Sequence, residues 1–184
     1  MQIAAFDTDE LADGTGKAKI TWIGRELLRS EKAFNTKLVT NADGTFKDGT
    51  GMIGGWGNSS STRMHLKNTI KPLMPDSVRG AIKDVTKTQY AYNISGDWFT
   101  QTTQDDIWIP SSREITENTY LELFTCNVIR SKKKPGATSY IVWHLRDAKY
   151  AKGNYYVTTS GKLPISVYSG GTDSLRGICI CFCT

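Results

Sequence analysis

The chain has 184 residues, of which 39% are hydrophobic and 22% charged, and its 23 Lys and Arg against 18 Asp and Glu give a net charge of +5. This length fits one domain with a sizeable core, residues 1–184, and the composition excludes disordered, collagen-like and bilayer-embedded chains. Because the positive charge is mostly scattered along the chain, it predicts no nucleic-acid partner.

The amino-terminal third combines one expected strand with less regular segments. Residues 1–10 lack a cationic start before an apolar stretch, so we expect no signal peptide. The alternation of apolar and polar residues over residues 17–23 predicts a half-buried strand. Residues 26–34 carry a weak apolar stripe and are expected to form a short helix. The glycine-rich residues 41–58 predict a long loop or a hairpin with an exposed tip.

Two short amphipathic helices are expected next. The first has three serines, residues 59–61, available as N-caps, and it is ended or kinked by Pro72. The second begins at Pro75, with Asp76 as its cap. Helical spacing predicts buried faces made of Leu66, Ile70 and Leu73 on the first helix and of Val78, Ala81, Ile82 and Val85 on the second.

The rest of the chain gives no further sign of helix, and its carboxyl third has the pattern of strands. No helical periodicity follows Thr86, and the apolar run before Pro110 predicts a buried strand that ends in a turn. The one dense basic run, Arg130 with residues 132–134, precedes Pro135-Gly136 and is interpreted as a solvated hairpin tip. Helices before strands make α+β the expected fold class, and no apolar run approaches the roughly 20 residues of a membrane helix, so we expect no membrane insertion. The four expected carboxyl-terminal strands are residues 140–145, 155–159, 163–168 and 178–182.

Three of the four cysteines, Cys179, Cys181 and Cys183, alternate with apolar residues at the carboxyl end. A strand would place these thiols on one face with neighbours roughly 6.6 to 7 Å apart. Thiolates on a tetrahedral zinc lie under about 4 Å from one another. We therefore expect small buried free thiols, with no metal and no other cofactor.

Few residues are available for catalysis. The chain has only two histidines and lacks the motifs of serine hydrolases, phosphate-binding loops and zinc proteases. The pair Asp105-Asp106 and the pair Glu114 and Glu117 are expected on the surface, because neither pair is bracketed by groups that would separate its pKa values. The residues therefore do not predict an enzyme.

The segment from Trp143 to Ser174 is rich in Tyr, Ser, Asn and charged residues. This mixture is typical of binding surfaces, because tyrosine offers rigid amphipathic area at a small entropic cost. An ordinary set of polar loops with tyrosines packed into the core is the alternative interpretation. The contact residues expected for a binding surface are Trp143, His144, Arg146, Asp147, Lys149, Tyr150, Asn154, Tyr155 and Tyr168.

An ordered set of short strings extends over most of the chain. The strings are Gly54-Gly55-Trp56-Gly57-Asn58-Ser59, Ala81-Ile82-Lys83-Asp84-Val85, Asp106-Ile107-Trp108-Ile109-Pro110-Ser111, Trp143-His144-Leu145-Arg146 and Arg176-Gly177. Together they resemble the bacterial and phage family called domain of unknown function 6273. The chain departs from the family pattern at Asp147, where serine is usual, and at Cys179-Ile180-Cys181, where arginine-proline-alanine is usual.

The resemblance implies a C-type lectin-like fold, as in formylglycine-generating-enzyme relatives and in the variable proteins of diversity-generating retroelements. Such a fold packs two helices on a twisted antiparallel sheet and forms its ligand face from carboxyl-terminal loops. It also implies binding rather than catalysis. The strings that coordinate calcium in lectins are absent, so calcium-dependent sugar binding is not expected.

The leading hypothesis is therefore a non-enzymatic ligand- or receptor-binding domain for adhesion, displayed on a virion tail or a bacterial cell surface. Its partner would be a host-surface protein or glycan, and an oligomer is compatible with this role. One version makes the chain the variable protein of a diversity-generating retroelement, by fold analogy. The alternatives are a metal-thiol enzyme of the formylglycine-generating-enzyme type and a purely structural tail module.

Overall fold

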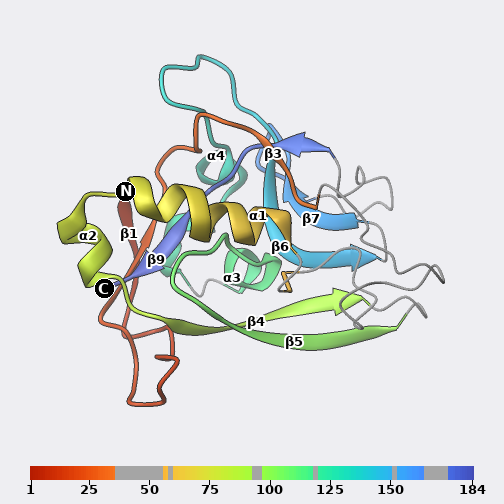
Figure 1. Cartoon of the computed structure of the whole chain (residues 1–184). Coiled ribbons are helices and arrows are strands. Elements are labelled where there is room, and N and C mark those ends of the chain that lie inside the picture. Colours follow the sequence, from red (N-terminus) through yellow and green to blue (C-terminus); the bar gives the residue numbers. More distant parts are fainter. Residues whose placement is uncertain (36–55, 58–59, 93–96, 118–119, 151–152, 164–173) are drawn as a thin grey trace, which may run out of the picture.

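The protein combines short helices with antiparallel strands, which confirms the α+β class (Figure 1). No helix in the described part of the chain is long and apolar enough to cross a membrane. The computed structural model describes residues 1–35, 56–57, 60–92, 97–117, 120–150, 153–163 and 174–184.

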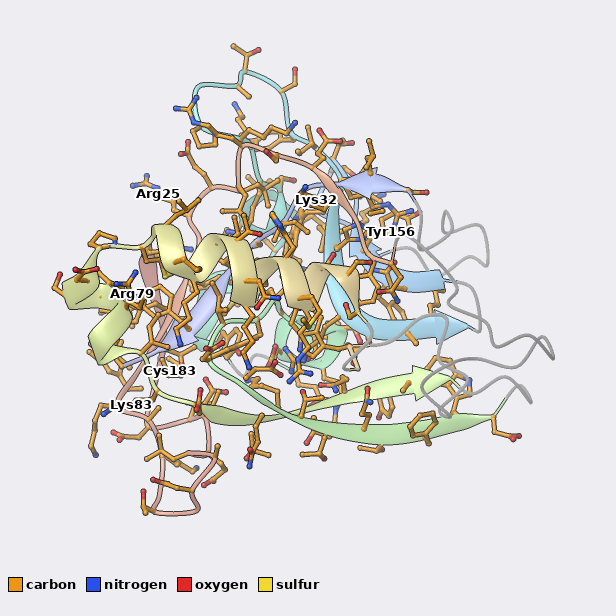
Figure 2. All side chains as sticks on the ribbon, in the orientation of Figure 1. Arg25, Lys32, Arg79, Lys83, Tyr156 and Cys183 are labelled. Carbon is orange, nitrogen blue, oxygen red and sulfur yellow. The ribbon has the colours of Figure 1, made fainter. Side chains whose placement is uncertain are left out.

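Three strands form one antiparallel sheet in the order β1 (Gln2–Phe6), β2 (Ile20–Ile23), β9 (Cys181–Cys183). The central strand β2 confirms part of the strand predicted from alternation, and Trp22 lies opposite Phe182. Beyond this sheet, the main-chain N–H of Lys83 donates to the carbonyl of Cys183 at 2.9 Å, and the two residues are neighbours in Figure 2. The first strand of the chain, β1, and the last, β9, therefore belong to the same sheet, with β2 between them.

A long hairpin joins β4 (Val85–Tyr92) to β5 (Trp98–Asp105) without a break in register. Its inward residues include Lys87 and Gln89, both buried, so the strand pair buries polar side chains where a strand of this length usually buries apolar ones. This mixed pattern explains why no strand is predicted from the sequence for this hairpin.

A second hairpin joins β6 (Trp143–Tyr150) to β7 (Gly153–Val157), with irregular register between His144 and Ala148. These strands overlap the predicted strands at residues 140–145 and 155–159. The predicted strand at 163–168 lies almost entirely outside the described residues, as does most of the predicted loop at 41–58.

The expected helix at residues 26–34 is absent, and this prediction was wrong. The segment is irregular with several bends, and its end forms β3 (Lys32–Ala33), which pairs with β8 (Leu175–Arg176). The main-chain N–H groups of Leu27 and Leu28 donate to Lys133 and Ile178, so distant carbonyls take the bonds that a helix would make locally.

The first helix starts as predicted. Ser60 caps α1 (Ser61–His65), because its side chain accepts the N–H of Arg63. A π-helical turn, η1 (Leu66–Ile70), and a 3₁₀ turn, η2 (Lys71–Leu73), follow. Pro72 lacks the N–H for a regular helical bond, which accounts for the change in winding and the end of the helix. Leu73, expected on the buried face, is 78% exposed.

The second predicted helix is α2 (Asp76–Ala81), and Pro75 rather than Asp76 occupies the cap position. Two further short helices, α3 (Ser112–Thr116) and α4 (Asn127–Arg130), flank a 3₁₀ turn, η3 (Leu121–Phe124). The basic run after α4 turns at Gly136, as predicted, with φ of 76°. Its Lys132 is nevertheless buried, with Nζ 2.6 Å from the carbonyl of Gly24, so the run is only partly a solvated tip.

The core lies between these sheets and α1, and it holds Trp56, Trp108 and Trp143, all fully buried. Trp108 bridges to Cys181, which confirms that the apolar run before Pro110 is buried and extended. Cys179, Cys181 and Cys183 are buried and free, as expected.

Candidate functional site

The structure separates the predicted contact residues into two groups. Because β6 is covered on both faces from Trp143 to Ala148, its side chains there are buried whichever way they point, and the prediction that they face outward was wrong. Lys149 and Tyr155 are half-buried. The side chain of Tyr150 and the whole of Tyr168 lie outside the described residues. The buried members are Trp143, His144, Arg146, Asp147 and Asn154.

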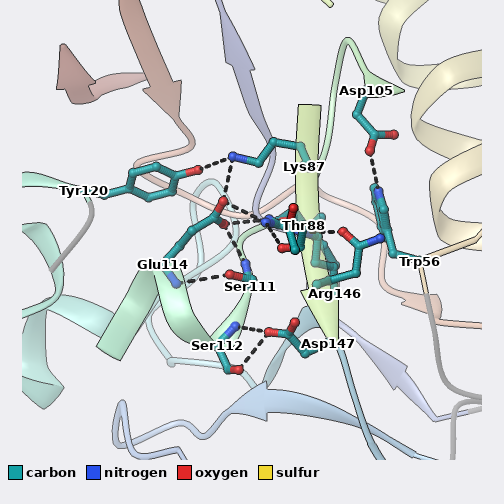
Figure 3. A network of polar contacts seen from close by, with 12 residues as sticks. Trp56, Lys87, Thr88, Asp105, Ser111, Ser112, Glu114, Tyr120, Arg146 and Asp147 are labelled. Atoms are coloured by element: carbon teal, nitrogen blue, oxygen red, sulfur yellow. Dashed lines mark hydrogen bonds and ion pairs between the residues drawn. The ribbon is translucent and has the colours of Figure 1, made fainter. Parts of the chain in front are cut away.

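Arg146 is the centre of a buried polar network (Figure 3). Its Nη1 and Nη2 donate to the two carboxylate oxygens of Glu114 at 2.6 and 2.7 Å. The remaining donors reach the carbonyls of Ile109 and Thr88 and the side chain of Gln89, at 2.9, 3.3 and 3.3 Å. All five N–H donors of the guanidinium are therefore used, which is what a charge with 1% exposure requires.

Glu114 is held in place by the first turn of α3. Ser111 and Glu114 form a capping box, in which the Ser111 N–H donates to Oε2 of Glu114 at 2.7 Å and the Glu114 N–H donates to Oγ of Ser111 at 3.0 Å. Burial alone would raise the pKa of Glu114, but Arg146 and Lys87 hold it well below its usual range. The earlier expectation that Glu114 is a surface carboxylate was wrong.

Lys87 joins Glu114 to the amino-terminal region. Its Nζ lies 2.6 Å from Oε1 of Glu114 and 2.5 Å from Oδ1 of Asp9, and it donates to the hydroxyl of Tyr120 at 3.2 Å. Burial would lower the pKa of Lys87, but the carboxylates of Glu114 and Asp9 raise it above its ordinary value. This ammonium therefore stays charged, and it is unsuited to act as a general base.

Asp147 connects the two hairpins. Its Oδ1 accepts the main-chain N–H of Tyr90 at 2.8 Å, and its Oδ2 accepts the N–H and the hydroxyl of Ser112 (Figure 3). Burial raises the pKa of Asp147, while Arg146 and these donors oppose the rise. Asp147, at the position where the resemblance implies serine, thus fills an interior position that fixes β4 against β6.

His144 is an interior hydrogen-bonding residue. Its Nε2 lies 2.9 Å from the carbonyl of Lys32, and its Nδ1 lies 3.1 Å from Nδ2 of Asn154, so Nε2 carries the proton and Nδ1 accepts. Burial lowers the pKa of His144 to about 3. A neutral imidazole with both nitrogens occupied cannot move a proton near neutral pH.

The carboxyl-terminal thiols have separate partners. Cys179 Sγ lies 3.5 Å from the carbonyl of Gly24, and Cys183 Sγ lies 3.4 Å from Oγ1 of Thr21. Burial raises the pKa of all three thiols, that of Cys183 to about 12, so they resist forming the thiolates that metals and nucleophilic catalysis need. Within the described ranges no three His, Cys, Asp or Glu side chains are grouped as metal ligands.

A groove of about 560 Å³ lies between α1 and the end of β5. Arg63 Nε contacts Oδ1 of Asp105 at 2.6 Å, and Lys71 contacts Asp106 at 2.5 Å, so ion pairs join the two walls. Asp105 also accepts from the indole N–H of Trp56 at 3.0 Å and is almost fully buried, which corrects its expected surface position. These pairs fasten the helix to the hairpin.

Two aromatic side chains, Tyr90 and Trp98, are exposed near the end of the β4–β5 hairpin, and Arg113 lies against one of them. We call these three residues the aromatic patch. Tyr90 and Trp98 are 36% and 48% exposed, and their rings meet edge to face with centroids 6.0 Å apart. The guanidinium of Arg113 lies 5.7 Å from the centre of the Tyr90 ring.

Two of the predicted contact residues lie near this patch. Lys149 Nζ lies 5.5 Å from the ring centre of Tyr155. Burial raises the pKa of Tyr155, and electrostatic interactions with Asp147 and Tyr90 raise it further. Sequence reasoning missed Tyr90 and Trp98, although threonines two residues away on the same strand, such as Thr88 and Thr100, indicate a solvated face.

The comparisons with known proteins identify a family. The profile described as Domain of unknown function (DUF6273) matches residues 26–181, a span that includes Lys87, Glu114 and Arg146. No curated protein and no solved structure matches the chain. The chain therefore belongs to the DUF6273 family.

Proposed function

We propose that this chain is a non-enzymatic ligand-binding domain that uses the aromatic patch, with Lys149 and Tyr155 beside it, as its contact surface. The observation that carries the proposal is the exposure of an edge-to-face Tyr90–Trp98 pair on rigid strands. Exposure of large aromatic side chains to water is unfavourable in free energy. Where such side chains cluster with cationic groups on a surface, they mark interaction sites.

The state of the interior supports binding over catalysis. The buried acidic and basic side chains form ion pairs with one another, such as Arg146 with Glu114 and Lys87 with Asp9. Catalytic groups need a pKa near the working pH and access to a substrate. Arg146, Glu114 and Lys87 have neither, since all three are buried and remain charged.

The partner we propose is a host-surface protein or glycan. The faces of Tyr90 and Trp98 offer apolar area, and Arg113, which also pairs with Glu117, and Lys149 add positive charge beside them. The finer assignment to a C-type lectin-like fold, and display on a virion tail or cell surface, belong to the same proposal. They rest on family resemblance and on the α+β architecture.

The retroelement version needs diversified residues on the surface. Five of the nine contact residues expected from sequence are buried, so this version rests on positions such as Lys149 and Tyr155. A near-copy of the segment beside a reverse-transcriptase gene would support it. Neighbouring DNA without either feature would remove it and leave the binding proposal intact.

The binding proposal is tested with alanine variants of Trp98 and Tyr90. The probes are an array of host glycans and surface proteins, and intact host cells. The matched control is Tyr140→Ala, since Tyr140 is 43% exposed and lies under Lys133 on another part of the surface. We expect about a tenfold or greater loss of affinity for Trp98→Ala and little change for the control. Equal binding by all three variants would refute the aromatic patch as the contact surface.

A further inference from the structure

Strand β5 forms one border of the molecule (Figure 1). It pairs with β4 on one side, and no other strand in the described part of the chain pairs with its outer side. Main-chain groups at such an edge are a template for another strand.

The register identifies which groups face outward. On β4, the carbonyl of Thr88 accepts from Arg146 and the N–H of Tyr90 donates to Asp147, so both residues direct their main chain away from β5. Their partners across the ladder are Thr102 and Thr100. In an antiparallel ladder, both members of such a pair turn their N–H and C=O groups away from each other. Thr100 and Thr102 therefore present these groups at the outer edge of β5.

Contacts at the other end of β5 agree with this assignment. The carbonyl of Gln104, two residues beyond Thr102, accepts from Nη2 of Arg63 at 2.8 Å. Helix α1 therefore covers the edge at Gln104, whereas Thr100 and Thr102 are exposed, and no other described element bonds their outward main-chain groups.

The open edge lacks the usual protection against pairing. Residues 98–104 contain no charged residue, no proline and no glycine. Natural proteins usually place lysine, proline or a bulge on such an edge to keep other strands away. An uncharged, regular edge of this kind favours a partner that is itself a strand.

We propose that the partner is a second copy of this chain, with the two β5 strands paired antiparallel about a two-fold axis at Thr100. At this register Thr100 exchanges two main-chain hydrogen bonds with the second copy's Thr100, and Trp98 lies opposite the second copy's Thr102. The side chains that face one another within residues 98–102 are all neutral. A register centred on Gln101 would instead set Trp98 opposite the second copy's Gln104, whose carbonyl already accepts from Arg63, which disfavours it.

The pairing has a structural consequence beyond the two strands. It joins two hairpins into a continuous sheet with strand order β4-β5-β5-β4, and sheets of more than two strands are more stable than an isolated hairpin. A two-fold axis that relates antiparallel strands is perpendicular to their sheet, so Tyr90 and Trp98 of both copies lie on one face. The dimer does not depend on the ligand proposed above, and it is tested without one.

The test is sedimentation equilibrium of the full chain and its variants, with circular dichroism as the check on folding. We expect the wild-type chain to dimerise reversibly with a Kd below about 1 mM. Thr100→Lys and Thr100→Glu each place like charges opposite each other at the axis, so each variant alone should be monomeric, and an equimolar mixture should recover the dimer. Leu73→Lys and Leu73→Glu, on an exposed residue away from β5, should dimerise like the wild type.

A second variant tests the main-chain bonds. Thr100→Pro removes an outward N–H that β4 does not use, so the fold should survive while Kd rises about tenfold or more. A wild-type chain that stays monomeric would overturn the proposal. So would a dimer that all three Thr100 variants leave unchanged, or a Lys and Glu mixture that fails to associate.

Discussion

A Cβ atom added to Gly161 would lie 1.6 Å from the main-chain oxygen of Asn127. Gly161 follows β7 with φ of 75°, and the close approach brings the turn after β7 against the start of α4. Only glycine satisfies both the positive φ and the missing side chain at this point.

Gly161→Ala should therefore lower the free energy of unfolding by about 2 kcal/mol or more, because it adds a main-chain clash to the cost of a left-handed alanine. Gly136→Ala is the matched control, since its φ is 76° but nothing lies within 4 Å of an added Cβ. Urea unfolding of both variants separates the two contributions. Equal losses would mean that the contact with Asn127 does not constrain the turn.

The Arg146–Glu114 pair predicts strong non-additivity. Arg146→Met alone leaves a buried carboxylate without its bidentate partner and should cost about 3–5 kcal/mol. Adding Glu114→Gln removes the stranded charge, so the double variant should be more stable than Arg146→Met alone. A double-mutant cycle measured by urea unfolding gives the coupling. Additive losses would contradict the direct interaction.

His144 predicts a loss of stability in mild acid. Its pKa is about 3 in the folded chain against 6.5 ordinarily, so below pH 6.5 the unfolded chain binds one more proton than the folded chain. Stability should then fall with decreasing pH by up to about 1.4 kcal/mol per pH unit. Glu114, whose pKa is lowered by folding, adds a further loss below its ordinary value of 4.5.

The range from pH 6.5 to 5 separates the contribution of His144 from that of Glu114, which begins below pH 4.5. There His144→Gln should flatten the dependence of unfolding free energy on pH, while His65→Gln, at a less buried histidine, should keep most of it. Unfolding by urea at several pH values measures both slopes. An unchanged slope in His144→Gln would show that this ring is not the titrating group.

The thiols predict a simple chemical result. Cys126 is exposed, whereas Cys179, Cys181 and Cys183 are buried with raised pKa values. A thiol reagent should modify Cys126 rapidly in the native protein and the other three only after unfolding. Cys126→Ser should abolish the fast phase, and fast labelling of a carboxyl-terminal thiol in that variant would contradict the burial.

Local signals in the sequence predicted local structure well. Ser60 caps α1, Pro72 accompanies the end of the helical segment, and Gly136 makes the turn after the basic run. Each of these features depends on residues a few positions apart, where capping and turn chemistry decide the conformation.

The interior charges could not be predicted in this way. Pattern analysis assigns Arg146, Asp147 and Glu114 to the surface because burying an unpaired charge is costly. Their burial is stabilised by partners distant in sequence, such as Glu114 for Arg146 and the Tyr90 N–H for Asp147. Similarly, strand alternation predicts one solvent-exposed face for β6, but both faces are buried from Trp143 to Ala148.

Lys87 brings together residues that are far apart along the chain. Asp9 is 78 residues before it, and Glu114 in turn binds Arg146, 32 residues further on. None of these charges can be buried favourably until all four segments have converged, because each would otherwise lose hydration without gaining its partner. The chain should accordingly fold slowly and cooperatively for its size, and the ion pairs of Lys87 and Arg146 should form late.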